Sequence, residues 1–245
     1  MDKARIRFRK DGALRLLSHH DLMRTFERLL RRSELPFHRS QGFHPKPRLI
    51  FALSLPLGVV GCEEVAELEL AEILSLDEIH ARLTRHAPPG LEILSVRRIP
   101  VRVNAQVYRL TYALPVPAER LPDLSRRIAD VLSASECWID RHRPHSGQAD
   151  RRLDVRPFLV DLLVQPPRGT SESAMLEMVL RLTTTGTARP HEVLGLLGLE
   201  DLLDAGAVLE RSRLELHDEY ADGLAGEPAS LATTQKGSHE KRDAD

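Results

Sequence analysis

Cysteine, aromatic residues and long apolar runs are all scarce in this sequence of 245 residues. Two cysteines, Cys62 and Cys137, are too few for a disulfide framework, a structural zinc site or a metal cluster. No stretch approaches the roughly 20 apolar residues that cross a bilayer, and the first ten residues lack an apolar signal-peptide run. Aromatic residues make up 4%, so we expect a core of Leu, Val, Ile and Ala. The expectation is a soluble, cytoplasmic protein without metal or cofactor.

Several motifs that carry chemistry are also missing. The sequence has no Walker loop, no glycine fingerprint for a dinucleotide and no paired-cysteine motif. Cys62 is followed by Glu63 and Glu64, and negative neighbours raise the pKa of a thiol, which argues against a reactive nucleophile.

The charge is uneven although the net charge is only −1. Residues 1–48 hold thirteen Lys and Arg against five acids, whereas residues 199–245 hold five against twelve. This asymmetry predicts that one face meets a polyanion, most plausibly RNA, while the acidic end stays solvated. The alternative is compositional, because lysine is scarce and 30 of the 35 basic residues are arginine.

The periodicity predicts an α+β fold with two tandem ferredoxin-like halves, each of order β-α-β-β-α-β. In the first half we expect a strand with an arginine face at 5–9, a helix from Ser18 to about Glu34, extended segments at 37–40 and 49–55, a strand at 65–70, a helix at 75–86 and a strand at 91–99. In the second we expect strands at 107–116, 137–141, 154–164, 175–183 and 208–216, with helices at 121–134 and 191–197. The extra strand makes the second half a looser match. The expected domains are residues 1–100 and 101–220, joined near Pro100, and 221–245 form a disordered acidic and polar tail.

Ser18 and Asp21 have the spacing of a helix cap. In the pattern S-x-x-D the serine caps the first turn, and this pattern explains both residues without catalysis. Neighbours on one helical turn cannot form a catalytic triad. His19 and His20 are not needed by the cap, and the exposed one could contact a phosphate at the helix N-terminus.

Folding alone explains least about the loop Gln41-Gly42-Phe43-His44-Pro45-Lys46-Pro47. Its two prolines stiffen the backbone, and we expect Phe43 to anchor it in the core. Gln41, His44, Lys46 and Arg48 form an edge rich in donors, which suits a phosphate or a base edge. The alternative is a rigid polar crossover loop.

Two groups of arginines could contact a polyanion. Arg24, Arg28, Arg31 and Arg32 fall opposite the apolar side of the first helix, and arginine suits bidentate phosphate contacts. They could equally form a solvated helix face. Residues 141–152, with Arg141, Arg143, Arg151 and Arg152, resemble a mobile basic hairpin tip, or else an ordinary surface loop.

A family resemblance is carried by residues 17–28, 41–47, 56–58, 153–158 and 188–194. In these segments the sequence resembles the radical SAM-linked family of unknown function. This family occurs alone or fused behind B12-binding-type radical SAM proteins. The resemblance implies a radical SAM partner for which this chain binds or positions a substrate. The family has Leu where this chain has His20, so His19 is the better candidate site residue. A weaker similarity is to repeat-associated RNA-binding proteins of CRISPR systems, whose glycine-rich C-terminal loop has no counterpart here.

Three functions follow as hypotheses, and they favour a binding module over an enzyme. In the first, an accessory protein holds RNA or a ribonucleoprotein for a radical SAM partner, in a basic cleft lined by Arg24, Arg28, Arg31, Gln41, His44, Lys46, Arg48 and Arg156. In the second, a metal-independent ribonuclease uses His19 or His44 as general acid or base. In the third, an adaptor docks its basic face on an acidic protein.

Overall fold

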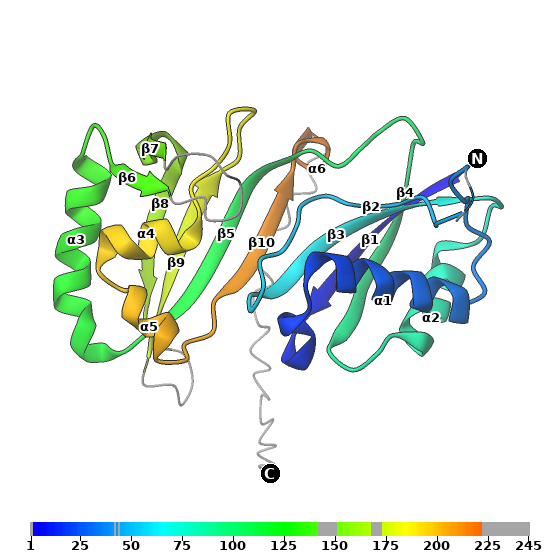
Figure 1. The fold of residues 1–245 in the computed structure, drawn as a ribbon, viewed down its shortest axis with the longest axis horizontal. Helices are drawn as coiled ribbons and strands as arrows, with labels where there is room; N and C mark the ends of the chain where they lie inside the picture. The colour runs from blue at the N-terminus through cyan, green and yellow to red at the C-terminus, as the bar shows by residue number, and fades with distance from the viewer. Residues whose placement is uncertain (1, 42, 44, 142–150, 168–172, 222–245) are drawn as a thin grey trace, which may run out of the picture.

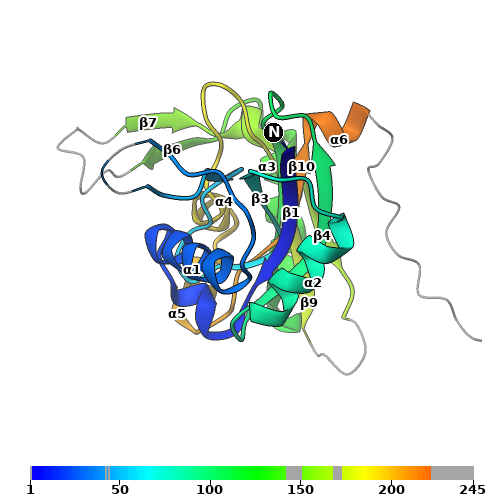
Figure 2. The same cartoon turned by 90° about the vertical axis from the view of Figure 1, so that its right-hand side faces the viewer.

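The computed structural model describes residues 2–41, 43, 45–141, 151–167 and 173–221. An eight-stranded sheet runs through the whole molecule, and a separate two-stranded hairpin lies beside it (Figure 1). Helices α1, α4 and α5 lie on one side of the sheet and α6 on the other (Figure 2). None of the helices in these residues is long and apolar enough to cross a membrane.

The N-terminal half forms one end of the sheet. Its elements are β1 (Asp2–Lys10), α1 (His19–Arg32), β2 (Leu49–Phe51), β3 (Val60–Leu70), α2 (Leu76–His86) and β4 (Leu91–Ile99). β1 lies between β3 and β4, β2 pairs with β3, and all of these pairs are antiparallel. The predicted helices and the strand at 91–99 are confirmed.

The C-terminal half forms the other end. Its elements are β5 (Val107–Val116), α3 (Leu121–Ser133), β6 (Trp138–Arg141), β7 (Arg151–Asp154), β8 (Leu159–Gln165), β9 (Ala174–Arg181), α4 (Pro190–Leu197), α5 (Glu200–Asp204), β10 (Glu210–Leu216) and α6 (His217–Ala221). The sheet order here is β10-β5-β9-β8, and β6 pairs only with β7.

The two halves join along β3. The end of β3 around Ala66–Leu68 pairs with β2, whereas Val60 and Gly61 at its start pair with β10 in parallel. The sheet is therefore continuous, in the order β4-β1-β3-β10-β5-β9-β8. A junction was predicted near Pro100, but a sheet shared by the two halves was not.

Alternation along β1 separates an apolar face from a charged one, because successive side chains of a strand point to opposite faces. Ala4, Ile6 and Phe8 are buried against the helices. Phe8 packs edge-on against Phe26 of α1, with 4.9 Å between ring centroids, and both rings contact Phe51. The opposite face of β1 carries basic residues, as predicted from the sequence.

Several predicted elements differ from the observed ones. The strand expected at 37–40 consists only of isolated bridges from Phe37 and Arg39, and the one at 49–55 shortens to β2. The strand expected at 154–164 is interrupted by a 3-10 turn at Arg156–Phe158, where Pro157 cannot donate a ladder hydrogen bond. The short helices α5 and α6 were not predicted. Residues 222–245, the greater part of the expected tail, lie outside the described residues.

Candidate nucleic-acid interface

The start of α1 is built around the predicted cap. The hydroxyl oxygen of Ser18 accepts a hydrogen bond from the Asp21 amide at 3.2 Å, and the same hydroxyl donates to the Asp21 carboxylate at 2.7 Å. This donation, together with the Arg24 cation, lowers the pKa of the Asp21 carboxyl. Capping therefore accounts for Ser18 and Asp21, as the spacing indicated.

The arginines of α1 point away from the core. Arg24 lies 3.2 Å from the carboxylate of Asp21, which partly neutralises it. Arg28, Arg31 and Arg32 are exposed and form no ion pair with any other described residue. α1 thus presents unneutralised guanidinium groups on its outer side, consistent with the amphipathic pattern.

The loop after α1 forms a narrow projection. The Ser40 amide donates to the Lys46 carbonyl at 2.8 Å and the Arg48 amide to the His38 carbonyl at 2.9 Å, so the two arms of the loop are held together. Lys46 and Gln41 are exposed, whereas Arg48 pairs with Glu69 at 2.9 Å. Gly42 and His44 lie outside the described residues.

Phe43 corrects one expectation. Phe43 was predicted to anchor the loop in the core, but its side chain is fully exposed. The ladder between the two arms holds the loop, so no apolar anchor is required. Nearby in sequence, the Arg39 guanidinium lies 5.3 Å from the centroid of the Phe37 ring. The loop therefore displays aromatic and cationic groups together.

A second exposed pairing of this kind lies on the β6–β7 hairpin. Trp138 is 47% exposed, and the guanidinium of Arg152 lies 5.1 Å from the centroid of its ring. Residues 142–150, which were expected to form a basic hairpin tip or a surface loop, lie outside the described residues. Arg152 was expected from the sequence but Trp138, the one tryptophan, was not, because their contact depends on the pairing of β6 with β7, and no strand was predicted at 151–154.

Figure 2 shows α1, the loop that follows it and the β6–β7 hairpin on the same side of the sheet, and Figure 1 shows that α1 and the hairpin lie at opposite ends of it. We call the exposed residues Arg28, Arg31, Arg32, Arg39, Phe43, Lys46, Trp138 and Arg152 the outer patch. Cations beside exposed rings are the combination that binds single-stranded nucleic acid, because the rings stack on bases while the cations contact phosphates.

Arg156 is not available to such a ligand. Its guanidinium donates to the carbonyl oxygens of Leu132, Ala134 and Leu159 at 2.8, 3.1 and 3.1 Å. Two of these acceptors lie at the C-terminal end of α3, where a cation is favoured by the helix dipole. Arg156 therefore holds α3 against β8, and we remove it from the predicted binding residues.

His19 and His20 have different surroundings. His20 is exposed, whereas the His19 ring packs edge-on against Phe51 and its Nδ1 is buried without a hydrogen-bond partner among the described residues. Burial lowers the pKa of His19, and the charges of His20 and Lys10 lower it further. The His19 imidazole is therefore neutral near pH 7 and can accept a proton.

A charged pair is buried between β3 and β10. The Arg211 guanidinium makes a bidentate pair with Glu64, with 2.7 Å from Nε to Oε1, and both side chains are almost wholly buried. Lys10 is fully buried, and its Nζ donates to the Leu17 carbonyl at 3.0 Å. Burial lowers the pKa of Lys10, although the nearby Glu64 opposes this shift. The pair links β3 to β10 at the junction of the halves.

The cysteines offer no reactive site. Burial and the neighbouring Glu210 carboxylate raise the pKa of Cys62 to about 11, and burial raises that of Cys137 as well. The pKa of Cys62 is raised, as predicted, but the Glu210 carboxylate contributes more to this increase than that of the adjacent Glu63. Among the residues with described positions, no three His, Cys, Asp or Glu side chains gather to hold a metal ion.

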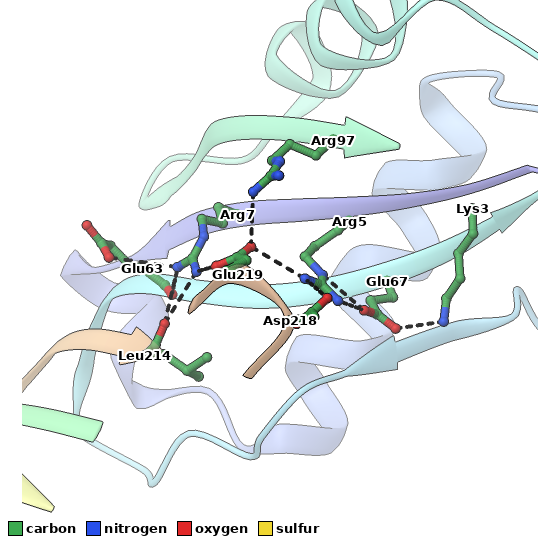
Figure 3. Close-up of polar contacts among 9 residues, drawn as sticks. All are labelled: Lys3, Arg5, Arg7, Glu63, Glu67, Arg97, Leu214, Asp218 and Glu219. Carbon is green, nitrogen blue, oxygen red and sulfur yellow. Dashed lines mark hydrogen bonds and ion pairs between the residues drawn. The ribbon is translucent and has the colours of Figure 1, made fainter. Parts of the chain in front are cut away.

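The charged face of β1 differs most from expectation. Arg5 is only 2% exposed, because α6 covers it and places Asp218 and Glu219 against the arginines (Figure 3). Glu219 is therefore not solvated as expected of the acidic end, and Asp218 is only partly exposed, whereas Glu200, Asp201 and Asp204 are exposed. α6 neutralises part of the basic N-terminal excess within the molecule.

A scan against protein families matches residues 3–190 to the family described as "Uncharacterized protein conserved in bacteria (DUF2344)". The chain belongs to this family. The DUF2344 match includes α1, the loop after it and the β6–β7 hairpin, and it ends at the first residue of α4, before β10 and α6. The description of this family does not mention a link to radical SAM proteins.

Comparisons with curated proteins and with solved structures do not define the protein further. No curated protein matches the chain. Among solved structures, a chain of the "Cbf5-Nop10-Gar1 Complex" is similar with a TM-score of 0.41 and 11% identity. The alignment covers 86% of this DUF2344 chain and 48% of that chain, so the protein spans about half the length of the structure that it matches.

Proposed function

We propose that this DUF2344 protein is a binding module that holds single-stranded RNA, or an unpaired part of a ribonucleoprotein, on its outer patch. One observation carries the proposal: the patch combines cations that no described carboxylate neutralises with a fully exposed Phe43 and a half-exposed Trp138. Stacking on such rings contributes about 1–3 kcal/mol per base, and arginine adds phosphate contacts. The patch replaces the predicted cleft and keeps three of its predicted basic residues, Arg28, Arg31 and Lys46.

The proposed interface is tested by removing two of its charges. In Arg28→Ala/Arg31→Ala we expect the affinity for a labelled oligouridine RNA to fall about tenfold, because two phosphate contacts are lost. The matched control is Arg85→Ala/Arg181→Ala, which removes two exposed arginines outside the patch. Fluorescence anisotropy measures both. Equal losses in the two variants would mean that the protein binds RNA by net charge alone.

We further propose a radical SAM protein as partner, with the DUF2344 chain positioning the substrate and supplying no redox group of its own. The sequence motifs that resemble the radical SAM-linked family support this. A cytoplasmic location would suit both RNA and such a partner.

We also interpret both halves as ferredoxin-like units. The order β4-β1-β3-β2 in the first half and β10-β5-β9-β8 in the second support this interpretation, since each places the first and third strands of its half at the centre. The β6–β7 hairpin would then be an insertion between the first helix and the second strand of its unit.

Metal-independent RNA cleavage is a second candidate function. It is favoured by the lowered pKa of His19, which leaves the imidazole able to accept a proton at neutral pH. Incubation with structured RNA in EDTA should then give cleavage that His19→Ala abolishes and His86→Ala leaves intact. If the RNA stays whole, or if both variants cleave it as the wild type does, the protein is a binding module without this activity.

A further inference from the structure

A second set of basic residues lies under α6, on the face of the sheet opposite the outer patch (Figures 2 and 3). The Glu219 carboxylate lies among three arginines: it pairs with Arg7, and its Oε1 is 3.4 Å from Arg5 and 3.6 Å from Arg97. Asp218 pairs with Arg5 at 2.6 Å. α6 thus places two carboxylates on the basic face of β1.

The charges balance only while α6 is in place. Glu67 of β3 is shared by Lys3 at 2.7 Å and Arg5 at 2.8 Å, and Glu63 lies 3.7 Å from Arg7. Figure 3 therefore contains four cations, Lys3, Arg5, Arg7 and Arg97, against four carboxylates. Half of these carboxylates come from α6, so its departure would leave two positive charges without a partner.

Polar contacts hold the start of α6. Besides the ion pairs, the His217 amide donates to the Gln106 carbonyl at 3.0 Å and the His217 ring lies 4.7 Å from that of Tyr108. A helix of five residues has little stability of its own. Phosphate oxygens accept the same guanidinium hydrogen bonds as the carboxylates of α6, so α6 is suited to reversible displacement by another anion.

We propose that the face beneath α6 is a second phosphate-binding site for RNA and that α6 occupies it as an internal competitor. This inference rests on the proposed function. The side chains of Arg5 and Arg7 project from one face of β1 about 7 Å apart, and Arg97 of β4 is the cross-strand partner of Arg5, so the three guanidinium groups are spread along the face rather than gathered at a point. Such an arrangement fits the repeating phosphates of an extended strand, and each guanidinium can hold a phosphate with two hydrogen bonds.

Competition lowers the apparent affinity for RNA, because only molecules with α6 displaced offer this site. Removing the two carboxylate charges should therefore strengthen binding. In Asp218→Asn/Glu219→Gln, which keeps the shape of both side chains, we expect RNA to bind about tenfold more tightly. The gain should disappear when Arg97→Ala, a change at the half-exposed rim of the site, is added to this variant.

The matched control is Glu72→Gln/Glu92→Gln, which removes two exposed carboxylates that form no ion pair with a described residue. Anisotropy with an oligouridine of about 20 nucleotides compares the variants at equal net charge. A second measurement uses the unaltered protein: on addition of RNA, hydrogen exchange across residues 210–221 should accelerate as α6 leaves.

The outcomes separate the two proposals. If RNA binding depends on Arg28 and Arg31 but the α6 variant behaves as its control, the outer patch stands and the site under α6 is refuted. If hydrogen exchange across residues 210–221 slows or stays unchanged when RNA is added, the site under α6 is refuted as well. If neither the protein nor the α6 variant binds RNA, both proposals fail. If Asp218→Asn/Glu219→Gln binds polyglutamate but not RNA, the site under α6 binds an acidic protein segment instead of RNA.

Discussion

Replacement of Glu64 by alanine is expected to lower the free energy of unfolding by about 3–5 kcal/mol, which is the usual effect of breaking a buried ion pair. Glu64 is 3% exposed and its partner Arg211 is 1% exposed, so solvent cannot compensate for the lost carboxylate. Lys10, also fully buried, would lose the same negative neighbour. The variant would therefore retain two buried cations without their counter-charge.

The position of the pair enlarges this effect. Glu64 belongs to β3 and Arg211 to β10, which pair directly through only two residues on each strand. Arg211 also donates to the Ser54 carbonyl at 3.2 Å and so fixes the segment that follows β2. Loss of the pair should weaken the connection between the two halves of the sheet.

Urea unfolding followed by circular dichroism measures this change. Glu72→Ala is the control, because an exposed glutamate without a described partner should alter stability by less than about 0.5 kcal/mol. Glu64→Leu/Arg211→Met, which replaces both charges with apolar groups, should recover most of the loss. A loss below about 1 kcal/mol for Glu64→Ala would show that the pair does not stabilise the junction.

Features set by neighbours in sequence were predicted well. The cap at Ser18, the helix that follows it and the strands β5 and β9 depend on spacings of a few residues, and the structure has them nearly where expected. Contacts between distant segments were not predicted. The Arg7–Glu219 pair joins residues 212 apart, and nothing in the periodicity of β1 indicates that a later helix will cover it.

In the candidate site, too, features set by neighbouring residues were predicted and contacts between distant segments were not. The outward arginines of α1 follow from helical geometry, so Arg28 and Arg31 were found from the sequence. Arg156 was misassigned because its three carbonyl acceptors come from α3 and β8, which only the folded chain brings together. Phe43 was misassigned because apolar character alone predicted burial, whereas backbone hydrogen bonds hold its loop.

The affinity for RNA should depend steeply on salt if the outer patch binds phosphates. Each phosphate contact releases a counterion, and for single strands the slope of log K against log salt is about −0.7 per contact. Contacts from about five of the six patch cations give a slope near −3.5 and about a hundredfold weaker binding when salt rises from about 50 to about 200 mM. Arg28→Ala/Arg31→Ala should make the slope shallower by about 1.4.

The salt titration of oligouridine binding by the unaltered protein, followed by anisotropy, is the most direct test of the central claim. We predict a linear plot with a slope near −3.5, which becomes shallower in Arg28→Ala/Arg31→Ala but not in Arg85→Ala/Arg181→Ala. A slope near zero, or no binding at the lowest salt concentration, would contradict the assignment of this protein as an RNA-binding module.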